Sequence, residues 1–167
     1  DYEKQQFVTM DEYLHMITLK TSVLLGASMK LGAMLGGATE GCSKLLFNFG
    51  QSLGIAFQLM DDYLDAFGDP TKTGKQIGGD ILSNKKTFLL TKAYEQSTEV
   101  EQKKIESILD GDQSVKVKEM LAYYKQKNIA FNKYQEYLKL QDADHPNFTQ
   151  YAHERVKYLK EYLHQTK

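Results

Sequence analysis

The sequence predicts an all-α protein, and three observations favour this fold class. Apolar residues recur at intervals of three and four along most of the chain, and helix-capping patterns precede several of these stretches. No stretch of useful length alternates apolar and polar residues as a half-buried β-strand would. We therefore expect a bundle of helices without a β-sheet.

The first predicted helix runs from about residue 9 to residue 35. Thr9-Met10-Asp11-Glu12 has the form of a capping box, in which the threonine bonds a backbone amide and Glu12 reaches back. Gly36-Gly37 supplies the stop, and Lys20-Thr21 interrupts the helix. One apolar side is formed by Tyr13, Met16, Ile17, Leu24, Leu25, Leu31 and Leu35.

The second predicted helix follows a cap at Thr39-Glu40 and runs from Gly41 to about Phe67. Gly50 and Gly54 each weaken it by up to about 1 kcal/mol relative to alanine, so we expect them to mark close contacts with another helix. The apolar surface is broad, which predicts burial on more than one side. It comprises Leu45, Leu46, Phe49, Leu53, Ala56, Phe57 and Met60, and a phenylalanine such as Phe57 is more often part of the core than of a cavity wall.

After a turn-rich loop at 68–80, shorter helices are predicted at about 84–96, 98–109, 115–127, 129–140 and 147–165. Thr98-Glu99-Val100-Glu101 offers a second capping box, and Gly111 ends the helix that it starts. His145-Pro146 breaks the chain before the last helix.

Three carboxylates stand near the end of the second helix. Asp61 and Asp65 lie one turn apart on one face, with Gln58 a turn below. Each acid in the last turn costs roughly 0.3–1 kcal/mol unless it is compensated, so Asp61, Asp62 and Asp65 call for a cation. Mg²⁺ fits best, because it accepts one or two carboxylates and takes other ligands from water and phosphate. The alternative is a solvated acidic helix end.

Lysines follow these acids. Lys75 lies between glycines in Gly74-Lys75-Gln76-Ile77-Gly78, and Lys85 opens the next apolar run in Asn84-Lys85-Lys86-Thr87. Acidic residues followed by lysines are suited to binding a magnesium diphosphate. The sequence therefore predicts a phosphorylated substrate.

The ordered motifs F-Q-x-x-D-D-x-x-D, G-K-x-x-G-x-D and N-K-x-T, preceded by Lys20-Thr21, resemble the C-terminal half of a trans-isoprenyl diphosphate synthase of the farnesyl, geranylgeranyl and polyprenyl type. The resemblance implies that residues 1–167 are the C-terminal portion of a single isoprenoid synthase domain, a partial helical bundle lacking the N-terminal helices. Such synthases carry an earlier DDxxD motif, and this sequence has no second one. We therefore expect the 167-residue chain alone to be inactive or nearly so.

The resemblance implies a prenyltransferase that condenses an allylic diphosphate with isopentenyl diphosphate through Mg²⁺-assisted ionisation, and that forms a homodimer. It assigns metal binding to Asp61, Asp62 and Asp65. It assigns diphosphate binding to Lys20, Thr21, Gln58, Lys75 and Lys85, and catalytic roles to Lys20, Thr21, Gln58 and Lys85. Alternatives are a non-catalytic regulatory subunit of a prenyl synthase, a terpene cyclase and a purely structural helical module.

Composition and charge limit the possible partners and the cellular location of the protein. The net charge of −1 gives no electrostatic footprint for nucleic acid or an anionic membrane. A single cysteine excludes an internal disulfide, and no run approaches the roughly 18 apolar residues needed to span a bilayer. With no signal peptide in the sequence, we expect a cytoplasmic protein.

Overall fold

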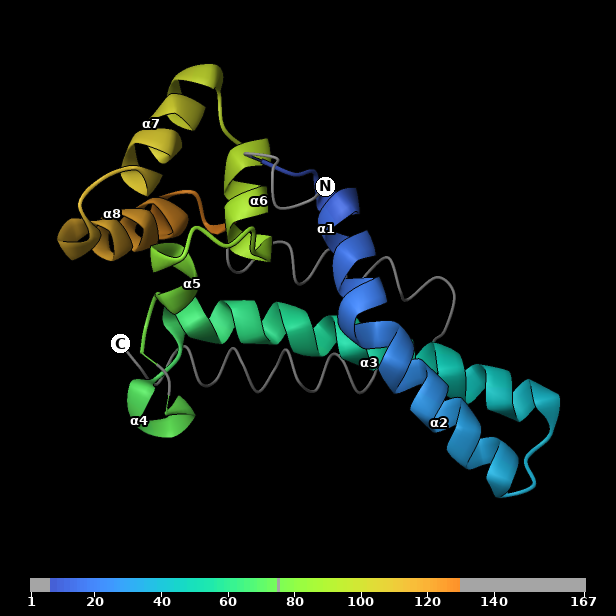
Figure 1. Ribbon diagram of the computed structural model, residues 1–167. Coiled ribbons are helices and arrows are strands. Elements are labelled where there is room, and N and C mark those ends of the chain that lie inside the picture. The colour runs from blue at the N-terminus through green and yellow to red at the C-terminus, as the bar shows by residue number, and fades with distance from the viewer. Residues whose placement is uncertain (1–6, 75, 130–167) are drawn as a thin grey trace. The chain divides into compact units, whose positions relative to one another are not determined.

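The computed structural model describes residues 7–74 and 76–129, and within these ranges it is helical without a β-strand (Figure 1). The chain divides into two compact units, residues 1–123 and 124–167, and the contacts described below lie within the first. The elements are α1 (Met10–Ile17), the π-helix η1 (Thr18–Ser22), α2 (Val23–Leu35), α3 (Glu40–Phe67), α4 (Pro70–Thr73), α5 (Gly79–Leu82), α6 (Phe88–Glu95), α7 (Glu99–Leu109) and α8 (Gln113–Gln126).

The all-α prediction is thus confirmed for the described residues. The helix predicted at 147–165 lies outside them, as does nearly all of the helix predicted at 129–140. None of the helices in the described ranges is both long and apolar enough to cross a bilayer.

Helix starts agree with the local capping patterns. Thr9 and Thr98 both form complete capping boxes, and Thr39 accepts a hydrogen bond from the backbone amide of Cys42 at 3.3 Å. These interactions join residues only three positions apart, so they depend on local sequence rather than on distant packing.

The helix predicted from residue 84 begins later, at Phe88. Asn84 has a left-handed backbone with φ 51°, which a regular right-handed helix cannot contain. Thr87 is extended instead and accepts a hydrogen bond from the amide of Leu90 at 3.3 Å. The segment 83–87 is therefore a loop that leads to an N-cap. The loop predicted at 68–80 contains two short helices, α4 and α5.

The π-helical segment η1 interrupts the first long helix at Lys20 and Thr21, where the sequence predicted an interruption. A π-helix contains more residues per turn than an α-helix, so the faces before and after it no longer align. Tyr13 and Ile17 on α1 are each 1% exposed, whereas Leu24 and Leu35 on α2 are 71% and 81% exposed. The predicted single apolar side is therefore not one continuous buried side.

Helices α2 and α3 pack closely through small residues, and in Figure 1 they lie side by side. A Cβ atom at Gly50 would lie 2.8 Å from the Cα of Gly26, and one at Gly54 would lie 2.7 Å from the Cα of Ser22. These separations leave no room for a side chain at either glycine. The predicted close contacts at Gly50 and Gly54 are confirmed.

Burial along α3 is uneven. Leu59 and Ala66 in the second half are 4% and 3% exposed, while Leu45 and Phe57 are 56% and 65% exposed. The prediction that Phe57 belongs to the core is wrong for the described structure, because the helices packed on α3 cover a different side. Burial on more than one side does not extend along the whole helix.

The core lies beside the second half of α3. The side chains buried there and in the adjoining helices include Tyr13, Ile17, Leu59, Phe88, Leu89, Ala93, Ile105 and Met120. Full burial of each large apolar side chain contributes about 1.5–3 kcal/mol. Helices α1 and α6 both contact α3. The part of α3 that carries the three aspartates is therefore packed against other helices.

Candidate functional site

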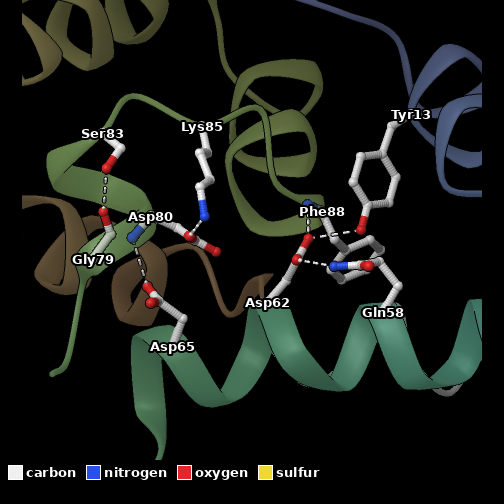
Figure 2. Close-up of polar contacts among 9 residues, drawn as sticks. All are labelled: Tyr13, Gln58, Asp62, Asp65, Gly79, Asp80, Ser83, Lys85 and Phe88. Atoms are coloured by element: carbon white, nitrogen blue, oxygen red, sulfur yellow. Dashed lines mark hydrogen bonds and ion pairs between the residues drawn. The ribbon is translucent and has the colours of Figure 1, made fainter. Parts of the chain in front are cut away.

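Asp62 is a buried carboxylate that joins three helices (Figure 2). Its Oδ2 accepts hydrogen bonds from the hydroxyl of Tyr13 at 2.7 Å and from the backbone amide of Phe88 at 2.8 Å. Its Oδ1 accepts a hydrogen bond from Nε2 of Gln58 at 3.2 Å. Residues of α1, α3 and the first turn of α6 therefore meet at this carboxylate.

Burial raises the pKa of Asp62 above its ordinary value, and this is the largest effect on the group. The hydrogen bonds from Tyr13, Phe88 and Gln58 oppose the rise because they stabilise the ionised form, whereas the nearby negative charge of Asp80 adds to it. Apolar periodicity predicts Tyr13 only as part of an apolar side. The available signal was its hydroxyl group, because a buried tyrosine usually needs a hydrogen-bond partner.

Asp65 binds the backbone of the loop that follows α4. The backbone amide of Asp80 donates to Oδ2 of Asp65 at 3.1 Å, and the amide of Gly78 donates to the Asp65 carbonyl at 2.8 Å. Gly78 has φ 78°, and a Cβ atom on it would collide with the side chain of Val117. A glycine at this position thus lets the loop reach the end of α3 while α8 packs against it.

Lys85 lies in the same cluster through Asp80. Its Nζ is 2.5 Å from Oδ1 of Asp80, and the side chains of the two residues are 64% and 15% exposed. The hydrogen bond with Asp80 is the main reason why the pKa of Lys85 is raised, and the charges of Asp65 and Asp62 add to the effect. Asp80 belongs to the G-K-x-x-G-x-D motif, but its link between Asp65 and Lys85 was not predicted from the sequence.

Asp61 is partly exposed and lies one turn before Asp65 on α3. Among the residues that the structure describes, no three His, Cys, Asp or Glu side chains are grouped so that they alone could hold a metal ion. Carboxylates at Asp61 and Asp65 nevertheless offer the oxygen ligands that Mg²⁺ prefers, and this ion takes its remaining ligands from water and phosphate. The donor chemistry of these two carboxylates therefore fits a magnesium ion.

The remaining predicted residues are distributed around this cluster. Lys20 is exposed and Thr21 is partly exposed on η1. The next residue, Ser22, packs against Gly54, one turn before Gln58 on α3. Asp61 and Asp65 form the acidic face of α3. Within the described ranges, the side chains of Lys20 and Thr21 form no hydrogen bond or ion pair with this face. Lys75 lies outside the described residues.

Residues 1–126 match the family model described as polyprenyl synthetase. A short chain isoprenyl diphosphate synthase of Methanothermobacter thermautotrophicus is 38% identical over 115 residues, which are 68% of this chain and 35% of that protein. A geranylgeranyl pyrophosphate synthase of Geoglobus acetivorans is 44% identical over 100 residues, 60% of this chain and 31% of that protein.

This chain also aligns with solved structures of prenyl diphosphate synthases. A decaprenyl diphosphate synthase from Rhodobacter capsulatus aligns with a TM-score of 0.72 and 29% identity, covering 95% of this chain and 52% of that one. A geranylgeranyl pyrophosphate synthetase from Pyrococcus horikoshii aligns with a TM-score of 0.69 and 33% identity, covering 83% and 44%. The chain thus spans about a third of the length of the curated relatives and about half of the solved chains.

Proposed function

The chain belongs to the polyprenyl synthetase family, and we propose on that basis that the intact gene product is a trans-prenyltransferase. It condenses an allylic diphosphate with isopentenyl diphosphate. The observation that carries the proposal is the acidic face of α3, which carries Asp61 and Asp65 one turn apart, with Asp65 joined to Lys85 through Asp80. The names of the relatives, which are isoprenyl and geranylgeranyl diphosphate synthases, support the same activity.

The reaction begins with ionisation of the allylic substrate. The C–O bond breaks, its electron pair leaves with the diphosphate, and the double bond of isopentenyl diphosphate attacks the resulting cation before a proton is lost. The protein must stabilise the negative charge that develops on the diphosphate. The ammonium groups of Lys20, Lys75 and Lys85 supply positive charge for this purpose.

We propose that Asp61 and Asp65 hold Mg²⁺. Asp62 supports them, either through a bridging water or by helping to position their side chains. When bound, the ion neutralises charge on the departing diphosphate. Thr21 and Gln58 hydrogen-bond near the ionising carbon. Three protein donors already bind the Asp62 carboxylate, which favours a supporting role for this residue.

Large apolar side chains are exposed on η1, α2 and the first half and middle of α3. Those on η1, α2 and α3 are Leu19, Leu24, Leu31, Met34, Leu35, Leu45, Leu46 and Phe57. A surface of this kind favours contact with other protein, either with further helices of the intact gene product or with a second subunit. We propose a homodimer, and light scattering on the intact gene product tests it.

We also place the activity in the cytoplasm, where the exposed thiol of Cys42 stays reduced.

The test is condensation by the intact gene product, using isopentenyl diphosphate with dimethylallyl, geranyl or farnesyl diphosphate. We expect product only with Mg²⁺, and a loss of at least about a hundredfold in Asp61→Ala and in Lys85→Ala, because each removes a group that stabilises developing charge. Lys103→Ala, an exposed lysine on α7, is the matched control and should keep full activity.

Two outcomes would redirect the proposal. A folded, intact gene product that turns over none of these substrates would favour the non-catalytic regulatory subunit, and a search for a catalytic partner would follow. Turnover by the 167-residue chain alone would show that an earlier DDxxD motif is unnecessary, because this sequence contains only one such motif.

A further inference from the structure

We propose that Tyr13 and Asp62 are positioning residues that set the orientation of the Gln58 side-chain amide for allylic ionisation. The inference rests on the proposed function and extends it to Tyr13, a residue of α1 whose hydroxyl binds Asp62. Its basis is the chain of hydrogen bonds that runs from Tyr13 through Asp62 to Gln58.

The carboxylate of Asp62 determines which end of the amide faces it. An ionised carboxylate can only accept hydrogen bonds, so it binds the NH₂ group of Gln58 and not the carbonyl. The Nε2···Oδ1 separation is 3.2 Å. Figure 2 shows the amide nitrogen directed at Asp62 and the amide oxygen on the side away from it. The amide is therefore held with its acceptor directed away from Asp62.

Tyr13 and Phe88 hold the carboxylate itself. Both donate to Oδ2, at 2.7 and 2.8 Å, which leaves Oδ1 for Gln58. Asp62 and Tyr13 are 5% and 1% exposed, so water has little access to replace a lost donor. The Tyr13 ring is fixed in turn against Phe88, with ring centroids 6.4 Å apart. Removing only the hydroxyl should thus loosen the carboxylate while leaving the ring packing in place.

The orientation matters because ionisation creates positive charge on the allylic carbon. The C–O electron pair leaves on the diphosphate, and no proton moves in this step. An amide oxygen carries partial negative charge and stabilises the cation, whereas an NH₂ group in the same place would oppose it. A preoriented oxygen needs no reorganisation during the reaction. Gln58 is only partly buried, which leaves its amide accessible to a substrate.

A double-mutant cycle in the intact gene product tests the inference. Tyr13→Phe should lower kcat for condensation about ten- to a hundredfold, with KM for both substrates unchanged, because small misplacements cost rate rather than binding. In a Gln58→Met background, Tyr13→Phe should cause no further loss, because the amide through which Tyr13 acts is gone. Tyr94→Phe is the control: its hydroxyl contacts Glu106 at 3.4 Å, and kcat should not change.

An equal loss of kcat from Tyr13→Phe in both backgrounds would overturn the inference, because it would indicate a general structural effect. So would a Tyr13→Phe enzyme with unchanged kcat.

A second measurement does not require activity. In the intact gene product labelled with ¹⁵N-glutamine, the side-chain amide signals of Gln58 are assigned by their loss in Gln58→Met. Tyr13→Phe should shift these signals and speed their exchange with solvent, while Tyr94→Phe should leave them unchanged. Unchanged signals in Tyr13→Phe would refute the positioning role even in an active enzyme. Absence of condensation by the unaltered protein would instead refute the proposed function.

Discussion

The hydroxyl of Tyr13 lies 2.7 Å from Oδ2 of Asp62, a buried contact between residues 49 positions apart. Asp62 accepts hydrogen bonds from Tyr13, Phe88 and Gln58, so its loss removes the acceptor that these three donors share. Asp62→Ala should lower the free energy of unfolding of the intact gene product by about 3 kcal/mol. Urea denaturation measures this loss. Asp61→Ala, at a partly exposed neighbouring position, should cost less than about 1 kcal/mol, and equal losses would contradict the structural role of Asp62.

The crossing of η1 and α2 over α3 predicts a contrast between glycines. Gly54→Ala places a Cβ atom 2.7 Å from the Cα of Ser22, so two backbones must separate, and we expect a loss of about 1–3 kcal/mol in unfolding free energy. Gly32→Ala, on α2 with nothing within 4 Å of its Cβ, should instead stabilise the protein by up to about 1 kcal/mol. Similar effects of the two substitutions on the thermal unfolding midpoint would contradict the close crossing.

Gly78 combines a left-handed backbone with steric contact, and the two causes can be separated. Gly74 has φ 66° with open space around it, whereas Gly78 has φ 78° and faces Val117. Gly74→Ala should therefore cost about 1–2 kcal/mol from strain alone, and Gly78→Ala about 2–4 kcal/mol. In a Val117→Ala background, the additional cost at Gly78 should disappear in chemical denaturation. If the additional cost persists there, Val117 is not its cause.

Asp80 raises the pKa of Lys85, mainly through their hydrogen bond. Asp80→Asn should therefore lower this pKa toward the ordinary value of 10.5, as an NMR titration of the Lys85 side chain would measure. Because the folded-state pKa lies above the unfolded value, the pair stabilises the fold fully below pH 10.5 and loses this contribution as pH rises through the folded-state pKa. Asp112→Asn, at an exposed carboxylate that is not among the groups raising the pKa of Lys85, is the control. An unchanged Lys85 titration in Asp80→Asn would contradict the assignment.

Parts of the site could be predicted from sequence because they depend on short separations. Asp61 and Asp65 share a face of α3 simply because they are four residues apart on a helix. Asp80 and Tyr13 could not be identified in this way. Their contacts with Asp65 and Asp62 span 15 and 49 residues, and such separations are set by how the helices pack. Lys75 lies outside the described residues, so its predicted role stays a prediction.

The sequence by itself determined the helical class, the capped starts of α1, α3 and α7, and the small residues at the α2–α3 contact. Each depends on periodicity or on hydrogen bonds within one turn. Only the tertiary structure decided which apolar side chains are covered, leaving Phe57 65% exposed, and that Asp62 joins three helices. The physical reason is that burial and long-range hydrogen bonds depend on which helix faces meet. The π-helical turn rotates those faces, and local periodicity contains no signal for that rotation.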